Sequence, residues 1–402
     1  MSAAAAAQFD RHGLIVLALA TFMSMAAMRA CDPLLPMLAQ TFAASTGDAA
    51  RTISAYAVAY GLLQLVYGPL ADRYGKFRVI AFGVAACVAT NVMAAVSDSL
   101  GALVWARTLS GAAAAGIIPM TLAWVGDAVS YERRQEILAH IMTATLLGTA
   151  FGQWASGLLA ESLGWRWAFA MIAAMFLVVA ACMLPMTPAR GPLARPAGTP
   201  GFARGVASVL SVPWARAILA ITLLQGAFAF TAMAFIPSYL HDRFGLSLNW
   251  AAAIVALFAL SGLAYTASAR WLIARLGEAG LASGGASLLG LAYLAIAFAP
   301  HWGWTAPACA VAGLGFVMLH STLQTHATQM APALRGTAVS LFGACLFLGQ
   351  SLGVLGAALL VDRVGFQTVF VVSGATIVLM GWGFARALRR RAARAATSTV
   401  TV

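Results

Sequence analysis

Long apolar runs separated by short polar turns fill most of the chain. Twelve such runs can be placed, at about residues 14–39, 50–70, 79–97, 101–126, 137–160, 167–185, 216–238, 250–272, 281–299, 303–329, 337–361 and 367–387. Each is near the roughly 20 apolar residues that a helix needs to cross a bilayer. Short alternating strands, which a membrane β-barrel would need, do not occur in them. The pattern predicts an all-α integral membrane protein with twelve transmembrane helices.

The two halves of the chain repeat one another. Equivalent residues stand 201 positions apart, as in Pro36 and Pro237, Gly61 and Gly262, and Arg134 and Arg335. The same offset relates Glu161-x2-Gly164 to Asp362-x2-Gly365. We therefore expect two pseudo-symmetric six-helix bundles, at residues 1–186 and 214–402, joined by a cytoplasmic linker at 187–213 that is rich in Pro, Gly and Arg.

Composition agrees with a membrane protein. Of the 402 residues, 62% are hydrophobic and 9% are charged, whereas a soluble domain has about 25% charged residues. The first apolar run is too long for a signal peptide and carries Arg29 and Asp32, so we expect it to remain as the first span.

The formal net charge of +12 is unevenly distributed. With the N-terminus cytoplasmic, 18 of the 24 basic residues fall on the cytoplasmic side, 4 on the other side and 2 within spans. This asymmetry follows the positive-inside rule and predicts a multi-pass protein with both termini in the cytoplasm. The charge gives no indication of a nucleic-acid partner.

Motifs for cofactor or metal chemistry are missing from the sequence. The five cysteines show no CxxC or Cys/His spacing, and there is no Walker loop for ATP. A membrane-embedded enzyme, a remote alternative, would need His, Asp or Cys clustered at one membrane face. We expect no cofactor and no metal site.

A charged turn separates the second and third apolar runs. It reads Gly68-Pro-Leu-Ala-Asp72-Arg73-Tyr-Gly75-Lys76. This G-x-L-A-D-R-x-G-K pattern resembles the loop between the second and third spans of the major facilitator superfamily of secondary transporters. The resemblance implies a substrate cavity between the two bundles and transport by alternating access.

The same resemblance makes the turn a candidate conformational gate. We expect Asp72 to face the N-terminal end of the eleventh span, where the helix dipole favours a negative charge, and Arg73 to reach Asp127 at the end of the fourth. Gly75 permits the tight turn, and Gly68 and Lys76 complete the motif. These contacts would hold the cytoplasmic side shut in the outward-open state.

Arg29 and Asp32 are ionisable residues within the first span. Such residues are costly in a membrane and are functional candidates, usually in pairs. Three positions apart on a helix, they can touch. Burial favours a neutral Asp32 and the arginine favours a charged one, so Asp32 is our candidate proton carrier. The alternative is a permanently ionised pair that locks the first span to a neighbour.

Arg107 and a glycine repeat extend the resemblance to the twelve-span bacterial multidrug/proton antiporters, which implies a bacterial inner membrane. Arg107 lies in an R-x-x-x-G pattern that the family assigns to proton transfer, which makes it a second candidate partner of Asp32. Its alternative role is to bind backbone carbonyls near the outer interface. Gly148-x3-Gly152 resembles the antiporter motif of the fifth span, although Gln153 stands where that motif has proline.

Polar side chains on other spans are candidates for the substrate cavity. On the tenth span His320, Gln324 and Thr328 recur every four residues. The complete candidate set is Tyr56, Tyr60, Gln64, Gln153, Gln225, His320 and Gln324. Ordinary helix packing, or a histidine with satisfied hydrogen bonds, would explain these positions equally well.

These features predict a secondary active transporter that exports drugs or small amphipathic compounds by proton-coupled antiport. The alternative is an exporter or importer of an endogenous metabolite such as a sugar, amino acid or siderophore. The expected partners are a small-molecule substrate, protons and the lipid bilayer, with the proton gradient as the energy source. We expect the chain to act as a monomer.

Overall fold

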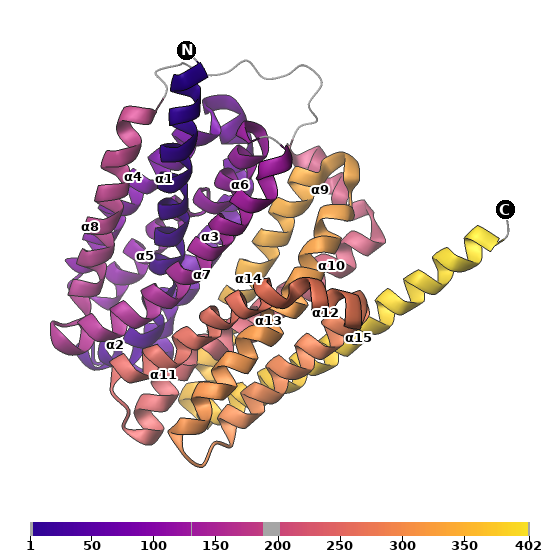
Figure 1. Ribbon diagram of the computed structural model, residues 1–402. Helices are drawn as coiled ribbons and strands as arrows, with labels where there is room; N and C mark the ends of the chain where they lie inside the picture. Colours follow the sequence, from indigo (N-terminus) through magenta and orange to yellow (C-terminus); the bar gives the residue numbers. More distant parts are fainter. Residues whose placement is uncertain (1–2, 130, 188–201, 401–402) are drawn as a thin grey trace.

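Helices form nearly all of the computed structural model, which describes residues 3–129, 131–187 and 202–400 (Figure 1). The elements are α1 Ala3–Arg29, η1 Asp32–Leu34, α2 Leu35–Thr41, α3 Thr46–Tyr74, α4 Lys76–Ala95, α5 Leu100–Ala114, α6 Ile117–Ala128, α7 Tyr131–Ser162, α8 Trp165–Met183, η2 Leu184–Met186, α9 Phe202–Ser211, α10 Pro213–Gln225, η3 Gly226–Phe230, α11 Thr231–Phe244, α12 Leu248–Ala297, η4 Trp302–Trp304, α13 Thr305–Gln329, η5 Pro332–Leu334, α14 Arg335–Val364 and α15 Phe366–Val400.

The predicted twelve spans are confirmed. Ten helical segments of the described chain are long and apolar enough to cross a membrane. One of them, α12, has 50 residues and is interrupted at Gly277 (φ 61°, ψ 178°), so it supplies two crossings. The 32-residue α7, which is less apolar, supplies the twelfth.

Two spans that the sequence presents as continuous are broken. In the first, α1 ends at Arg29 and a 3-10 turn carries Asp32 before α2 begins. Pro33 explains this break, because its ring nitrogen cannot donate a helical hydrogen bond. In the seventh, the π-helix η3 interrupts the α-helix at Gly226–Phe230.

The predicted linker is only partly described. Residues 188–201 lie outside the described residues, whereas the following segment, Phe202–Ser211, is the helix α9 and α10 begins at Pro213. The division of the chain at 187–213 stays a prediction.

The two halves have separate cores and share a third. One apolar cluster is built from the first half and another from the second. The third joins Leu35 and Ile53 to Phe235, Leu248 and Val354. We call the side that carries Ser45, Glu161 and Asp362 the distal side, and the side that carries the start of α1 and Asp72 the terminal side. The shared cluster lies toward the distal side.

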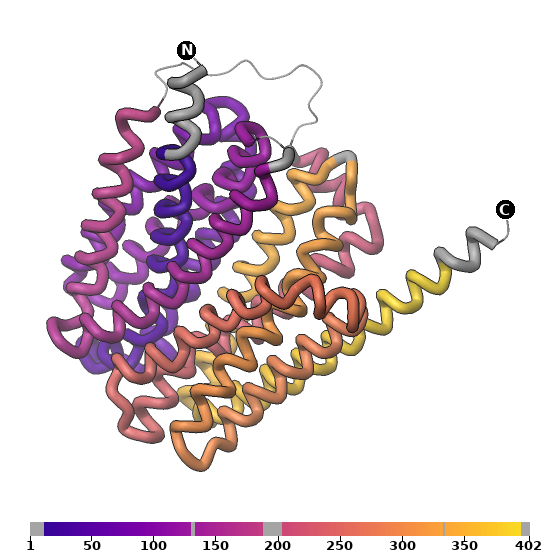
Figure 2. Tube along the Cα trace, viewed as in Figure 1, coloured from indigo at the N-terminus to yellow at the C-terminus, as the bar shows by residue number. Residues whose placement is uncertain are grey.

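The halves converge on the distal side and diverge from there. In Figures 1 and 2 the two groups of helices meet around α2 and α11. Along α3 and α14, Ser54 and Ser351 are joined by a 2.8 Å hydrogen bond. Farther along, an added Cβ at Gly61 would lie 3.1 Å from the carbonyl oxygen of Ala344.

This contact between α3 and α14 ends before the terminal side is reached. A Cβ added to Gly68 or Gly336 would meet no atom within 4 Å. The structure thus describes a pair of helix bundles that is closed on the distal side and separated on the terminal side.

Candidate functional site

Arg29 and Asp32 lie together at the break in the first span. Their Nη1 and Oδ2 atoms are 3.5 Å apart. Both residues are buried, with 2% and 0% of their surface exposed. The structure therefore places this predicted pair in contact, away from solvent.

Gln153 completes the surroundings of the carboxylate. Its Nε2–H donates to Asp32 Oδ2 over 3.2 Å. Among the described residues, Asp32 Oδ1 has no hydrogen-bond partner. The glycines beside Gln153 allow this approach, since a Cβ at Gly152 would lie 2.5 Å from the Cα of Ala26. Gln153 supplies a donor that a proline at this position could not.

Arg107 binds the first span through its backbone. Its guanidinium donates to the carbonyl oxygens of Ala27 at 2.9 Å and Met28 at 3.4 Å, and Cζ lies 4.3 Å from the ring centroid of Tyr56. These carbonyls belong to the last turn of α1, where no later N–H satisfies them. Arg107 caps this helix end as a cation, which the helix dipole favours.

The expected direct ion pair between Arg107 and Asp32 is therefore not formed. None of the ion pairs within 4.0 Å among the described residues joins them. The carbonyl-binding role weighed from the sequence is the observed one, but it occurs in the interior, with Arg107 0% exposed.

Arg29 also contacts the other half of the chain. Its Cζ lies 4.3 Å from the ring centroid of Phe230, in the π-helix η3. Tyr293, which sequence reasoning missed, donates its hydroxyl to the carbonyl oxygen of Ala229 over 2.5 Å and so supports the same turn. The sequence offered one sign of this role, a tyrosine within the otherwise apolar ninth span.

The tyrosines of α3 are packed between helices. Tyr56 and Tyr60 are each 1% exposed and stack with ring centroids 6.1 Å apart. Tyr60 meets Phe347 of the second half edge-on at 4.5 Å. Gln64 is buried against Gly343. In this conformation Tyr60 and Gln64 fill the junction between α3 and α14, whereas Tyr56 packs on Arg107 of α5.

His320 lies in an aromatic environment on α13. Its Nδ1 is 3.0 Å from Gln225 Oε1, which joins two predicted cavity residues. The imidazole lies between the rings of Phe316 and Phe342, at 5.2 and 5.3 Å. Gln324 is partly buried, and no described residue forms a hydrogen bond with its side chain.

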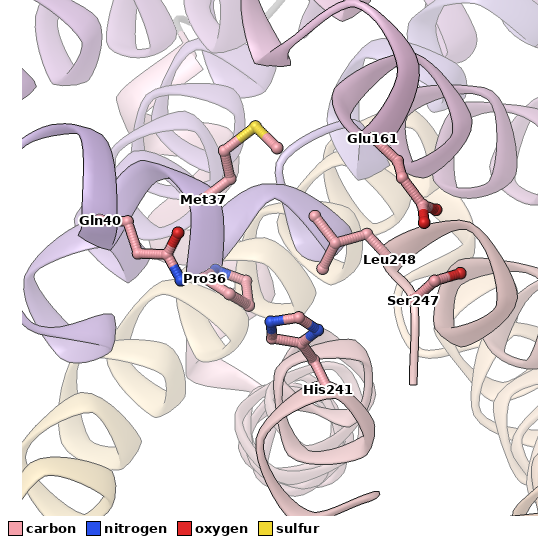
Figure 3. A pocket seen from close by; sticks show the side chains of 7 residues that line it. All are labelled: Pro36, Met37, Gln40, Glu161, His241, Ser247 and Leu248. Atoms are coloured by element: carbon pink, nitrogen blue, oxygen red, sulfur yellow. The ribbon is translucent and has the colours of Figure 1, made fainter. Parts of the chain in front are cut away.

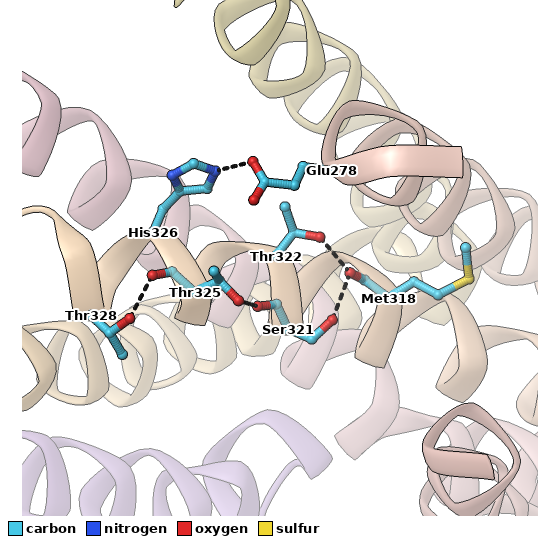
Figure 4. Close-up of polar contacts among 7 residues, drawn as sticks. All are labelled: Glu278, Met318, Ser321, Thr322, Thr325, His326 and Thr328. Atoms are coloured by element: carbon cyan, nitrogen blue, oxygen red, sulfur yellow. Dashed lines mark hydrogen bonds and ion pairs between the residues drawn. The ribbon is translucent and has the colours of Figure 1, made fainter. Parts of the chain in front are cut away.

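The remaining polar side chains of α13 mostly bond to their own helix. In Figure 4 the hydroxyls of Ser321, Thr322, Thr325 and Thr328 point to carbonyl oxygens within the same helix. Such bonds satisfy a hydroxyl inside a membrane without a ligand. The predicted polar face is present, and much of its hydrogen-bonding capacity is already used.

The charged turn forms a different ion pair from the one expected. Lys76, not Arg73, pairs with Asp127, and its Nζ–H also donates to the carbonyl oxygen of Ala123 over 3.4 Å. Gly75 (φ 88°) reverses the chain, so Lys76 opens α4 beside α6. Arg73 remains on α3, with Cζ 5.3 Å from the ring of Tyr74.

Asp72 is exposed, and no described residue forms a hydrogen bond or ion pair with it. Its expected contact with the start of α14 is absent from this arrangement because the halves are separated there.

The second half has its own version of the Lys76–Asp127 bridge. Gly277 stands where the repeat places Gly75, and the next residue, Glu278, lies 3.1 Å from His326 near the end of α13 (Figure 4). Here the acid stands at the start of the helix, and its partner is a histidine. Each half thus fixes its own turn internally.

A pocket of about 260 Å³ lies between the halves on the distal side (Figure 3). It is lined by Pro36, Met37, Gln40, Glu161, His241, Ser247 and Leu248. Among the described residues, no cluster of three or more His, Cys, Asp or Glu side chains could hold a metal ion.

Comparisons with known proteins agree with this architecture. The family described as the Major Facilitator Superfamily matches residues 17–354. A curated relative, the uncharacterized MFS-type transporter YceJ of Bacillus subtilis (strain 168), is 26% identical over 362 residues, 87% of this chain and 88% of that protein. The multidrug export protein EmrB of Haemophilus influenzae is 26% identical over 155 residues, 39% of this chain and 30% of that one.

Solved structures show the same fold at low sequence identity. A structure of the nucleoside transporter NupG superposes with a TM-score of 0.76 at 16% identity, covering 92% of this chain and 98% of its own. A peptide transporter POT in complex with sulfate gives a TM-score of 0.74 at 16% identity and 94% coverage of both chains. The family match, the paired six-helix bundles and the charged turn together make this chain a member of the major facilitator superfamily, a secondary transporter and not an enzyme.

Proposed function

We propose that this transporter exports small amphipathic compounds, drugs among them, in exchange for protons, with Asp32 as the proton carrier. The observation that carries the proposal is the buried Asp32 carboxylate, held by Arg29 and Gln153, with Arg29 stacked on Phe230 of the other half. This arrangement connects a titratable group in one bundle to the position of the other.

The energies involved favour a carboxylate that can change its charge. At 3.5 Å and an effective dielectric constant of about 20, the attraction between Arg29 and Asp32 is about 5 kcal/mol. Removing each charge from water costs several kcal/mol. Because these terms are of similar size, a modest change in the surroundings is enough to favour either the charged or the protonated Asp32.

Movement of the bundles supplies that change. When the halves rock, Phe230 moves relative to Arg29, and the cation–π contact, worth about 2 kcal/mol when desolvated, is altered. The strength of the Arg29–Asp32 ion pair then differs between the two conformations, so proton binding to Asp32 is linked to the position of the bundles. Such linkage requires that the proton bind the two states with different affinity.

The substrate class is inferred from the side chains around the junction of the halves. Tyr60, Phe347, Phe230 and Phe316 offer aromatic surface, while His320 and Gln225 offer neutral hydrogen-bonding groups. These groups suit amphipathic molecules with few charges. The partial similarity to a multidrug export protein supports the same class.

An endogenous metabolite is the second candidate, because the fold is shared with transporters described as carrying nucleosides and peptides. The distribution of basic residues supports an orientation with the terminal side in the cytoplasm. The similarity to bacterial transporters supports a bacterial inner membrane. The protein would then export toward the distal side, as a monomer.

Transport in liposomes tests the proposal. Purified protein is reconstituted, a pH difference is imposed, and uptake of ethidium, uridine and a dipeptide is measured. We expect the pH difference to drive uptake of ethidium by the wild-type protein. Asp32→Asn should reduce this uptake to the level of empty liposomes. Asp98→Asn, an exposed acid on the distal side, is the control and should transport normally.

Unchanged pH-driven uptake by Asp32→Asn would rule out Asp32 as the carrier. Transport of uridine or the dipeptide alone would instead favour the metabolite alternative.

A further inference from the structure

Two acidic residues outside the central site stand at the distal ends of two helices. Glu161 lies in the last turn of α7, and Asp362 lies in the last turn of α14. A carboxylate at this end is unfavourable for its own helix, because the carbonyl groups there carry partial negative charge. A favourable interaction with another helix would explain why acidic residues stand at these two positions.

Each carboxylate binds the first turn of a helix in the other half. Asp362 accepts hydrogen bonds from Ser45 Oγ at 2.7 Å and from the Gly47 N–H at 3.2 Å, at the start of α3. Glu161 accepts one from the Asn249 N–H at 3.2 Å, at the start of α12. First-turn N–H groups have no partner within their own helix, so both carboxylates satisfy donors that would otherwise need water.

The two contacts are equivalent under the internal repeat. Glu161 and Asp362 are 201 positions apart, and Gly47 and Asn249 are 202 apart. Each receiving helix is preceded by an N-cap serine whose side chain accepts a hydrogen bond from the first turn, Ser45 before α3 and Ser247 before α12. The same arrangement thus occurs twice, once in each direction across the interface.

Close backbone packing accompanies both contacts. A Cβ added to Gly47 would lie 2.8 Å from the carbonyl oxygen of Ala358. One added to Gly157, a turn before Glu161, would lie 2.8 Å from the carbonyl oxygen of Leu248. The glycines let the helices approach closely enough for the carboxylates to reach the N–H groups. In Figure 3 Glu161 lies beside Ser247 at the edge of the distal pocket.

We propose that Glu161 and Asp362 form a paired latch, which holds the distal side closed by capping α12 and α3 and is released when the transporter opens on that side. Both carboxylates are exposed, so water can replace the partner N–H groups when the helices part. The bonds are therefore reversible. Glu161 and Asp362 are positioning residues, since they act through the helices and stand apart from the central Arg29–Asp32 pair.

A distance measurement across the distal side tests the latch without any substrate. The five native cysteines are replaced, and spin labels are attached at Thr41→Cys and His301→Cys. These two positions are exposed and lie in opposite halves. Their distance distribution is recorded in lipid nanodiscs, and short distances report the closed distal side. We expect Asp362→Asn and Glu161→Gln each to shift the closed-to-open ratio toward open by about tenfold, as loss of one charge-assisted hydrogen bond implies.

Two further variants separate a latch from a general loss of structure. Asp362→Glu keeps the charge and should largely restore the closed distances, whereas Asp98→Asn removes an acid from the same side and should change nothing. A double variant Glu161→Gln/Asp362→Asn that is folded and still shows the original distribution would overturn the proposal. Because the two contacts involve different helices, either single variant carries the test if the other does not fold.

Discussion

At the scale of single residues, Arg107 is a buried charge for which the sequence allows two roles. Arg107 could neutralise Asp32 or satisfy backbone carbonyls, and it binds the carbonyls of Ala27 and Met28. The break after Arg29 creates those acceptors. Asp32 is held by Arg29 and Gln153. Two arginines therefore stabilise the broken span, Arg29 through the carboxylate and Arg107 through the carbonyl groups.

This account predicts that Arg107→Lys destabilises the protein by about 1–3 kcal/mol, the cost of leaving a buried polar group unsatisfied. A lysine ammonium cannot reach both carbonyls in the planar geometry of a guanidinium, and it loses the stacking on Tyr56. Thermal unfolding in detergent measures the effect. Arg51→Lys, at an exposed ion pair with Asp48, is the matched control and should change the midpoint little. Equal midpoints for both variants would contradict the capping role.

At the scale of elements, α3 and α14 make contact in a regular antiparallel register. Ser45 lies opposite Asp362, Ser54 opposite Ser351, and Gly61 opposite Ala344. The sum of the two residue numbers stays nearly constant, so the register can be extended beyond Gly68, where the contact now ends. Extended to the terminal side, it brings Asp72 opposite Arg335, at the start of α14.

We therefore expect Asp72→Cys and Arg335→Cys to form a disulfide when the terminal side closes, since cross-linking needs Cα atoms within about 7 Å. In the arrangement described here the yield should be low, and it should rise in the background of Asp362→Asn, which favours opening of the distal side. Asp72→Cys with Arg363→Cys, on opposite sides, is the negative control. A yield that stays the same when the distal latch is removed would contradict this register.

How much of this could be predicted from the sequence depended on the range of the interaction. Spans, the repeat and the turn at Gly75 follow from local composition, and Arg29 and Asp32 meet because they are neighbours in the chain. Partners such as Gln153 for Asp32 were not predicted, because they depend on how helices distant in sequence rotate and approach. The partner of Asp127 was wrongly predicted for the same reason. Arg73 lies in the last turn of α3, whereas Lys76, just beyond the turn at Gly75, begins α4 and so lies beside Asp127.

At the scale of the whole molecule, three of the contacts between the two bundles bear on transport. Apolar side chains form the shared distal cluster, two carboxylates cap helices across the interface, and Arg29 stacks on Phe230 near the centre. In the mechanism that we propose, the first two hold the distal side closed, and the third connects that state to Asp32. Alternating access in this chain would then require that distal opening and a change of charge at Asp32 occur together.

Proton release on substrate binding tests this central claim most directly. Purified protein in weakly buffered detergent is mixed with ethidium, and a pH-sensitive dye reports released protons, with Asp98→Asn as the control. The account predicts about one proton per transporter for the wild type and the control, because a single carboxylate changes its charge. It predicts none for Asp32→Asn. Equal proton release by Asp32→Asn and the wild type would contradict it.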